Sequence, residues 1–301
     1  MESISSTVKW LILGAGGQLG NALVRLLENT ESKQDIKAFD HRQADITNAM
    51  QIEQIVKTFQ PDQIVNAAAW TDVAGAESNI DLVNNVNTQG AINVAIAAKI
   101  TGASLLHIST DYVFNGDFKL PISEDEKQNP LNKYGESKAN AEILLTEGFR
   151  GSVVILRTAW LYGPKGKNFA RTVIAKAINN KDEEIRVVND QWGQPTSTLD
   201  LAEKIIELGK KRIKTGIFHG TNSGKTNWYE FAKYLLESAE LDSTAIKPIN
   251  SLQFPTPVER PRYSVLSHEG WKDIGIMPMR DWRLPARELA KVIRDEVENG
   301  F

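Results

Sequence analysis

The segment Trp10-Leu-Ile-Leu-Gly14-Ala-Gly16-Gly17-Gln-Leu-Gly20 joins an apolar run to a helical pattern through closely spaced glycines. A tight turn needs positive φ, which glycine adopts at little cost. A pyrophosphate must approach the backbone closely to sit on a helix N-terminus, and the last glycine lets helix and strand pack together. Gly14, Gly16, Gly17 and Gly20 therefore predict a dinucleotide-binding turn, with a plain glycine turn as the alternative.

Apolar runs and helical patterns alternate through the first half of the chain. The runs lie at 8–13, 36–39, 64–68, 104–109 and 153–157, and the helical patterns at 18–28, 50–59, 81–101 and 137–147. This alternation is typical of strand–helix–strand units on a parallel sheet. Continuously apolar strands indicate a sheet that is covered on both faces. We predict an α/β protein with a doubly wound parallel (Rossmann) sheet.

The rhythm changes after Tyr162. A Gly-Pro-Lys-Gly loop at 163–166 comes first, and prolines are frequent from 250 to 285. Helical patterns at 169–178, 199–211 and 228–239 alternate with short strands at 185–188 and 217–220. We predict that residues 1–160 form an NAD(P)-binding domain to which 198–222 returns. Residues 161–197 and 223–301 would form a smaller α/β substrate domain with a loop-rich tail.

Composition excludes several classes of protein. Hydrophobic residues make up 41% and charged residues 24% of the chain, which is ordinary for a globular protein. A net charge of -3 without a long basic run argues against a nucleic-acid partner. No apolar stretch approaches the roughly 20 residues of a membrane span. Cysteine is absent, which fits a cytoplasmic location and leaves no thiolate metal site.

Charged residues follow the second predicted strand. Asp40 stands where an acid binds the ribose hydroxyls of NAD. His41 and Arg42 come next, and a cation there suits the 2′-phosphate of NADP. The two signals point to either NADPH or NADH as cofactor. The alternative is a set of solvated charges at the end of a strand.

A possible catalytic group follows the fourth predicted strand. Ser109-Thr110 ends this strand, at the sheet edge where ligands bind. Tyr134 and Lys138 are four residues apart and share one face of a predicted helix. A lysine ammonium close to the phenol would lower the phenol's pKa and prepare it to protonate a ketone oxygen, to which Thr110 would also bond. A surface Tyr–Lys pair is the alternative.

The chain resembles the extended short-chain dehydrogenase/reductases, and among them the dTDP-4-dehydrorhamnose reductase family. The resemblance follows family order over nearly the whole chain and rests on these segments: the glycine loop 14–20, Val65-Asn-Ala-Ala-Ala69, Ser109-Thr-Asp-Tyr-Val-Phe114, Pro130–Lys138, Arg157–Tyr162, Asn168-Phe169, Asp190-Gln-Trp-Gly-Gln-Pro-Thr196, Trp228-Tyr229 and Arg260-Pro261. It implies NAD(P)H-dependent reduction of the 4-keto group of dTDP-4-dehydro-L-rhamnose, in dTDP-rhamnose biosynthesis.

The resemblance also implies roles for individual residues. Thr110, Tyr134 and Lys138 would be catalytic. The cofactor would contact the glycine loop with Gln18 and Leu19, the 40–46 segment with Asp45 and Ile46, Asn66, Ala67, Ala68, Ala69, Tyr134 and Lys138. The dTDP-sugar would contact Thr71, Thr110, Asp111, Tyr112, Trp160 packed on the sugar, Asn168, and Arg260 facing the diphosphate.

Departures from the family pattern leave alternatives open. Trp70 and Ala74 adjoin the expected substrate cleft where other residues are frequent, so a reductase or epimerase of a related nucleotide-sugar is an alternative. A non-catalytic, dinucleotide-binding regulatory subunit is another. Some members hold magnesium at a dimer interface through glutamates, but Ala22 and Leu199 stand at those positions, so no metal is expected. Either a monomer or a homodimer is expected.

Overall fold

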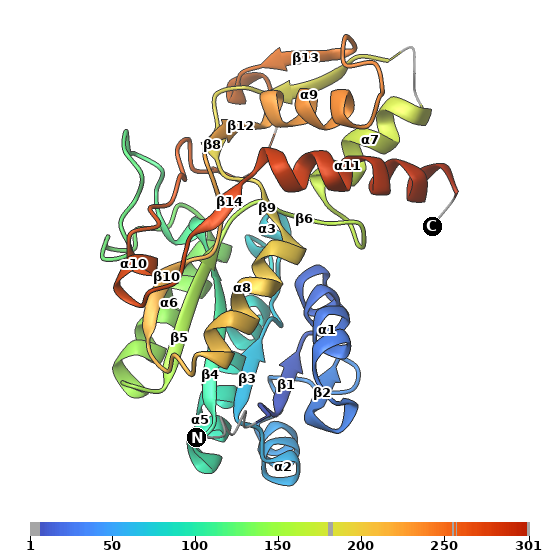
Figure 1. Cartoon of the computed structure of the whole chain (residues 1–301). Coiled ribbons are helices and arrows are strands. Elements are labelled where there is room, and N and C mark those ends of the chain that lie inside the picture. The colour runs from blue at the N-terminus through green and yellow to red at the C-terminus, as the bar shows by residue number, and fades with distance from the viewer. Residues whose placement is uncertain (1–6, 180–182, 255, 257, 300–301) are drawn as a thin grey trace.

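The computed structural model describes residues 7–179, 183–254, 256 and 258–299. Its largest element is a six-stranded parallel sheet in the order β10-β5-β4-β3-β1-β2. The strands are β1 (Trp10–Leu13), β2 (Ile36–Phe39), β3 (Gln63–Asn66), β4 (Ser104–Thr110), β5 (Val153–Thr158) and β10 (Gly216–His219). A smaller unit lies above the carboxyl ends of these strands (Figure 1). The predicted doubly wound parallel sheet is confirmed.

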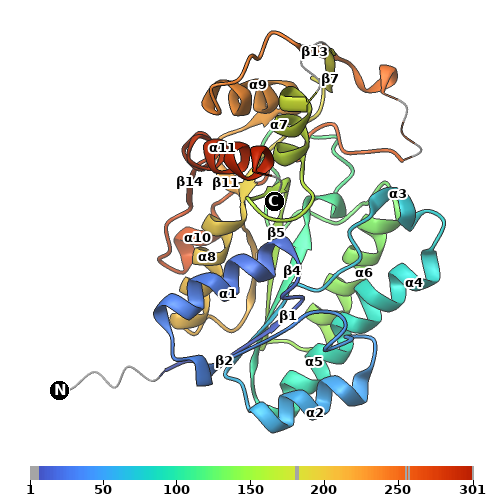
Figure 2. The same cartoon turned by 90° about the vertical axis from the view of Figure 1, so that its right-hand side faces the viewer.

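Helices cover both faces of the sheet (Figure 2). One face carries α1 (Gln18–Thr30) and α8 (Thr198–Lys210), and the other carries α2 (Ala49–Phe59), α5 (Gly90–Thr101) and α6 (Lys133–Gly148). Alternate side chains of β1 point to opposite faces of the sheet: Ile12 packs in one hydrophobic core, and Leu11 and Leu13 pack in the other. Two-sided burial is the reason why the strands read as unbroken apolar runs.

The order of the strands indicates where on the sheet a ligand would bind. β1 pairs with β2 on one side and with β3 on the other, so the chain changes direction across the sheet between β1 and β3. Ligands of such sheets bind outside the carboxyl ends of the strands at this point. The last strand, β10, pairs with β5, and α8 packs beside α1. Segment 198–219 therefore lies on the first sheet.

The upper unit has its own hydrophobic core. α7 (Phe169–Asn179), α9 (Trp228–Ser238) and α11 (Arg283–Glu298) enclose it (Figure 1). Its sheets are only two-stranded: β6 (Leu161–Tyr162) with β9 (Thr196–Ser197), β7 (Ile185–Val188) with β13 (Ile246–Ile249), β8 (Trp192–Gly193) with β12 (Thr226–Asn227), and β11 (Asn222–Ser223) with β14 (Met279–Asp281).

One helix was not predicted, and another was predicted without its irregular turn. The tail was expected to be loop-rich, but α11 spans sixteen residues of it and buries Leu289, Ala290 and Ile293 on one face. Pro285 lies in the first turn of α11, where a missing N–H breaks no hydrogen bond. The expected helix at 81–101 is present, and within it α4 (Ile80–Asn84) passes through a π-helical turn at Asn85–Gln89 into α5.

The short helix α10 (Gly270–Asp273) and its neighbours pack away from the upper unit. Trp271, Ile276 and Met279 join the core beneath α1 and α8. This segment was expected in the substrate domain, so the two units share the chain in more pieces than composition indicated. The division into two domains stays a prediction. No described helix has both the length and the apolar character to cross a membrane.

Candidate active site

A cleft of about 440 Å³ opens at the carboxyl ends of β1, β3, β4 and β5. Five segments that lie far apart in the sequence contribute to its wall. The lining residues are Gly17, Gln18, Leu19, Gly20, Ala67, Ala69, Thr71, Val73, Ile108, Ser109, Thr110, Asp111, Tyr112, Tyr134, Lys138, Thr158, Ala159, Trp160, Leu161 and Lys167. Its size lies within the range of ordinary ligand pockets.

The glycine loop has the geometry of a phosphate cradle. Gly14 adopts φ +86°, and a Cβ there would stand 2.6 Å from the backbone nitrogen of Ala68. A Cβ on Gly20 would overlap the carbonyl oxygen of Gly14, so helix α1 can approach β1 only with glycine at this position. No side chain caps α1 at Gly17. The first N–H groups of α1 therefore remain available to an anion, and the loop fits a dinucleotide pyrophosphate.

Asp40 and Arg42 lie beside this loop and are paired with each other. The Arg42 guanidinium donates to Asp40 Oδ2 at 2.8 Å through Nη2 and at 3.2 Å through Nε. The hydrogen bond from Arg42 lowers the pKa of Asp40. The Asp40 Cβ lies 3.2 Å from the place of a Cβ on Gly16, so the carboxylate borders the cradle. Asp40, which was expected to bind the ribose of NAD, and Arg42, which was expected to bind the 2′-phosphate of NADP, thus form an ion pair with each other.

Thr110, Tyr134 and Lys138 all line the cleft. Helix α6 begins at Lys133 because the Asn132 side chain accepts a hydrogen bond from the backbone N–H of Gly135 at 2.9 Å. This cap places Tyr134 and Lys138 in the first two turns, beside the end of β4. The same Asn132 side chain donates to the carbonyl oxygen of Glu259 at 3.0 Å, which connects a loop of the upper unit to the start of α6.

The expected lowering of the Tyr134 pKa by Lys138 was wrong. Burial raises the pKa of the Tyr134 phenol, and a hydrogen bond with Thr110 offsets only part of the rise. The Lys138 ammonium points elsewhere: Nζ donates to the carbonyl oxygen of Ile108 at 2.6 Å and lies 2.9 Å from His107 Nε2. Burial lowers the pKa of Lys138 to about 8. Helical spacing brings Tyr134 and Lys138 to one face, but β4 holds the amine.

Asp111 supplies a buried carboxyl group next to Thr110. Thr110 Oγ1 donates to Asp111 Oδ1 at 3.1 Å, whereas Asp111 Oδ2 is buried without a hydrogen-bond partner. Burial raises the pKa of Asp111 to about 6, against the opposing effect of the Ser264 and Thr110 hydroxyls. The Tyr112 ring meets the Tyr134 ring edge to face, with 5.7 Å between centroids. An unsatisfied acceptor in the cleft fits a ligand that brings hydroxyl groups.

Trp160 forms part of the cleft wall and is held in an unusual conformation. Its φ is +47°, which a bulky side chain rarely adopts. Its indole stacks on Trp228 with centroids 3.6 Å apart, and a Cβ on Gly193 would lie 2.6 Å from the ring. Backbone strain that the surroundings maintain is typical of functional sites. The stack on Trp228 and the close approach of Gly193 fix the orientation of Trp160.

Eleven of the expected site residues lie outside the lining of this cleft: Gly14, Gly16, Asp40, His41, Arg42, Asp45, Ile46, Asn66, Ala68, Asn168 and Arg260. Asn168 Nδ2 bonds to Gln18 Oε1 at 3.1 Å and to the Gly163 carbonyl at 2.9 Å, so this side chain holds a loop against the glycine turn. Ile46 packs against Gly90 of α5. Roles for these residues in ligand binding stay predictions.

Arg260 stands at the margin of the site. Its Nε is buried without a hydrogen-bond partner. Its charge acts on the Tyr112 phenol and offsets part of the burial effect that raises the pKa of Tyr112 to about 12. The neighbouring residue Pro261 packs against Gly116. Gly116 has a φ of +77°, and a Cβ there would stand 2.6 Å from the Cα of Pro261. An arginine donor with no partner at this position fits an anionic ligand.

Sequence reasoning missed Lys167, His107 and Asn87. Lys167 lines the cleft, its carbonyl oxygen accepts a hydrogen bond from Gln18 Nε2 at 3.1 Å, and it lies in a Gly-Pro-Lys-Gly-Lys run that was interpreted only as a turn. Asn87, on the π-helical turn, bonds to the Trp70 backbone N–H at 2.8 Å and to Ser137 Oγ at 2.9 Å. Nothing in a single sequence distinguishes these residues from neighbouring polar side chains.

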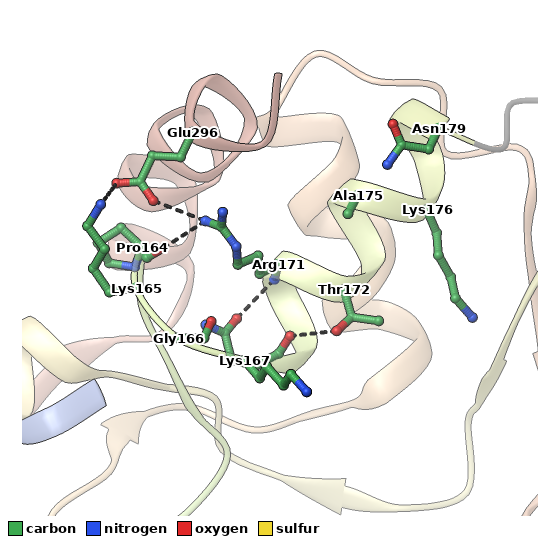
Figure 3. A pocket seen from close by; sticks show the side chains of 11 residues that line it. Pro164, Lys165, Gly166, Lys167, Arg171, Thr172, Ala175, Lys176, Asn179 and Glu296 are labelled. Atoms are coloured by element: carbon green, nitrogen blue, oxygen red, sulfur yellow. Dashed lines mark hydrogen bonds and ion pairs between the residues drawn. The ribbon is translucent and has the colours of Figure 1, made fainter. Parts of the chain in front are cut away.

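A second groove, of about 530 Å³, follows the outer face of α7 (Figure 3). Glu296 of α11 closes one end, where it pairs with Arg171 at 3.0 Å and with Lys165 at 3.1 Å. Lys167 lines both this groove and the cleft. No group of three or more His, Asp or Glu residues in the described ranges could hold a metal ion.

Comparisons with known proteins agree with this geometry. Residues 8–295 match the family described as the RmlD substrate binding domain. A dTDP-4-keto-6-deoxy-D-glucose reductase of Streptomyces niveus is 37% identical over 92% of this chain and 94% of its own length. A dTDP-4-dehydrorhamnose reductase of Streptomyces griseus is 38% identical over 93% of this chain and 92% of its own. A dTDP-4-dehydrorhamnose reductase of Bacillus anthracis, solved in complex with NADP, superposes with a TM-score of 0.89 at 37% identity, over 94% and 98% of the two chains.

Proposed function

Because this chain belongs to the family of the RmlD substrate binding domain, we propose that it is an NAD(P)H-dependent reductase of a dTDP-4-keto sugar, with dTDP-4-dehydro-L-rhamnose as its substrate. The observation that carries the proposal is the meeting of a hydroxyl, a phenol and an amine, from Thr110, Tyr134 and Lys138, in the cleft that the uncapped end of α1 also borders. A purely regulatory subunit needs the cradle but not these three groups.

The reduction needs a hydride and a proton. The glycine loop and the start of α1 would hold the nicotinamide dinucleotide, and the chemistry that this cofactor would supply is hydride donation to the ketone carbon. Tyr134 would supply the proton to the ketone oxygen as negative charge develops there. The raised pKa of Tyr134 favours this role, because the phenol stays protonated at neutral pH. The Thr110 hydroxyl has a single hydrogen, which it would turn from Asp111 Oδ1 to the same ketone oxygen to stabilise the developing charge.

The remaining residues would hold the two ligands. The N–H groups at the start of α1 would bind the cofactor pyrophosphate, with the Lys167 cation nearby in the same cleft lining. Asp111 Oδ2 would accept from a sugar hydroxyl, and Trp160 would pack against the apolar face of the sugar ring. Arg260, with its partnerless Nε, would meet the diphosphate at the margin of the site.

The test is turnover with product analysis. The purified chain is incubated with NADPH and dTDP-4-dehydro-β-L-rhamnose, NADPH oxidation is followed by absorbance, and the sugar product is identified by NMR. We expect conversion to the 4-hydroxy sugar. NADPH binding without any turnover of a dTDP-4-keto sugar would contradict the proposal and support a regulatory role.

The name of one relative supports a second candidate substrate. The Streptomyces niveus relative is a dTDP-4-keto-6-deoxy-D-glucose reductase, which reduces the 4-keto group of a different hexulose. In this chain Trp70 packs with Tyr112 and Tyr134, so the residue that departs from the family pattern adjoins the substrate end of the cleft. The same assay with dTDP-4-keto-6-deoxy-D-glucose, compared as kcat/KM, decides between the two sugars.

A further inference from the structure

A buried chain of three side chains runs behind the cleft, from β3 through β4 to α6. Asn66, His107 and Lys138 are each no more than 2% exposed. Asn66 Nδ2 lies 3.3 Å from His107 Nδ1, and His107 Nε2 lies 2.9 Å from Lys138 Nζ. Only Lys138 of the three lines the cleft. The imidazole therefore touches the amine from the side opposite the ligands.

The hydrogen bonds of Asn66 determine where His107 carries its hydrogen. Asn66 Oδ1 accepts from the backbone N–H of Ala68 at 3.2 Å, so the amide nitrogen of Asn66 is the atom that faces His107. An amide nitrogen only donates, so His107 Nδ1 must accept. Burial lowers the pKa of His107 well below 6.5, which keeps the ring neutral. A neutral ring with an accepting Nδ1 has its hydrogen on Nε2.

This hydrogen points at the amine of Lys138. A charged ammonium carries three hydrogens and has no lone pair with which to accept another. An uncharged amine accepts from Nε2–H and still donates to the Ile108 carbonyl at 2.6 Å. The contact between His107 and Lys138 is thus fully satisfied only when Lys138 is uncharged. The free energy of this contact opposes charging of the amine.

We propose that His107, oriented by Asn66, is a positioning residue that holds the Lys138 amine at the cleft wall and favours its uncharged form. The inference rests on the proposed function, in which Lys138 acts beside Tyr134. It assigns to the buried pair the control of the pH at which Lys138 gains and loses its charge.

Other charged and titratable groups near Lys138, in the part of the chain that the structure describes, do not hydrogen-bond to its amine. Glu142, one turn further along α6, favours the charged amine, but it is itself paired with Arg157 of β5 at 2.7 Å. Asp111 and Tyr134 also border the cleft, at the end of β4 and on α6. Asn66, the residue contributed by β3, is neutral. The His107 ring, in contrast, is titratable and contacts the Lys138 amine directly.

Two substitutions should raise the pH at which activity falls. In His107→Gln a side-chain oxygen can accept from the ammonium, which favours the charged form. In Asn66→Asp the carboxylate accepts from Nδ1–H, which moves the ring hydrogen to Nδ1 and leaves Nε2 free to accept. A charged Lys138 would stabilise the negative charge that develops on the ketone oxygen beside Tyr134, so activity of the wild type should decline above about pH 8, where Lys138 loses its charge. We expect the decline to shift upward by about one pH unit in both variants.

Two further variants are controls. His107→Phe fills the volume but neither donates to the amine nor accepts from it, so the alkaline limb should shift upward less than in His107→Gln, and kcat should fall at least about tenfold while KM for NADPH changes little. His268→Gln alters a histidine that bonds to Thr221 outside the cleft, and its pH profile should match that of the wild type. A merely structural role for His107 predicts equal losses in the Gln and Phe variants and no shift in either.

Histidine NMR tests the arrangement without turnover. The chain has four histidines, and the signal missing from His107→Gln assigns His107 in a ¹⁵N-histidine-labelled sample. We expect a neutral ring with hydrogen on Nε2 in the wild type and on Nδ1 in Asn66→Asp. Hydrogen on Nδ1 in the wild type, or unshifted limbs in both His107→Gln and Asn66→Asp, would overturn the inference. Loss of the proposed function would appear instead as a wild type that turns over no dTDP-4-keto sugar while its histidine spectrum is as expected.

Discussion

The two halves of the cleft are held by different means. On one side, β3, β4 and β5 are bonded in register, and the residues behind them form buried polar networks around His107 and Arg157. On the other side, the strands are two to four residues long, and the wall depends on single contacts such as the Trp160–Trp228 stack. Under the proposed function, the chemistry, which tolerates little displacement, would take place beside the continuous sheet. The contacts that select the substrate would lie on the side with the short strands, where sequence changes disturb less structure.

The largest expected effect concerns the sheet side. Tyr134→Phe should lower kcat by about 10²–10⁴-fold, because it removes the proton donor and keeps the ring that packs with Tyr112 and Trp70. NADPH binding, measured by fluorescence titration, should change little. A variant with kcat within threefold of the wild type would show that Tyr134 is not the proton donor. The reaction would then not depend on the sheet side of the cleft in the way proposed.

The second prediction tests the rigidity of that side. Arg157 and Glu142 are 1% and 0% exposed and pair at 2.7 Å, and Ser109 next to Thr110 also bonds to Glu142. Arg157→Met leaves a buried carboxylate unpaired, which should lower the free energy of unfolding by roughly 3–5 kcal/mol. The matched double variant Arg157→Met/Glu142→Leu should recover most of the loss in urea unfolding. Equal losses in the two variants would show that packing, not charge, connects α6 to β5.

The third prediction moves to the substrate side. Arg260→Ala should raise KM for the dTDP-sugar by about 10- to 100-fold, as expected for loss of hydrogen bonds between charged groups. KM for NADPH should stay near the wild-type value. Arg262→Ala is the control, since it removes a neighbouring cation from the same loop. An unchanged sugar-nucleotide KM in Arg260→Ala would place the diphosphate elsewhere.

A fourth prediction concerns the indole stack. Trp228→Leu removes the ring that holds Trp160, and a stacked aromatic pair is worth about 0.5–1.5 kcal/mol. KM for the dTDP-sugar should therefore rise about 2- to 13-fold with kcat less affected. Trp228→Phe, which keeps a stacking ring, should restore most of the affinity. Near-ultraviolet circular dichroism reports the loss of the paired indoles independently of turnover, and an unchanged spectrum would contradict the stack.

The sheet and the substrate side also differ in how far the sequence predicted them. Strands of the parallel sheet were found to within two residues because burial on both faces makes them continuous apolar runs. The start of α6 at Lys133 depends on the Asn132 cap, and the π-helical turn depends on Asn87 contacts that reach 50 residues along the chain. Helix α11 was missed because Pro285 resembles a terminator until the chain is seen to begin a helix there.

The same limit applies to the site. Gly14 and Gly20 were predictable because the backbone geometry excludes a side chain at both positions, and at Gly17 a Cβ would stand 3.3 Å from the carbonyl oxygen of Gly14. The position of the Lys138 amine was not, since it depends on His107 and the Ile108 carbonyl from another element. Short-range patterns identify the residues that approach a ligand. Hydrogen bonds across elements decide which atoms those residues present.

The smallest expected effect concerns the cofactor end, where the ion pair of Asp40 and Arg42 lies at the surface. Arg42 is 78% exposed, so water and salt screen its charge and any contact with a 2′-phosphate. Arg42→Ala should raise KM for NADPH by less than about tenfold and leave KM for NADH nearly unchanged, because only NADPH carries the extra phosphate. Removing Arg42 also frees the Asp40 carboxylate, which then repels that phosphate and can accept from the free ribose hydroxyls of NADH.

Asp40→Asn is the matched variant: it should weaken NADH binding and spare NADPH. Initial rates with both cofactors at low and moderate salt provide the measurement, and the NADPH effect should shrink as salt rises. Equal losses for the two cofactors in Arg42→Ala would mean that Arg42 orders the loop after β2 and does not distinguish NADPH from NADH.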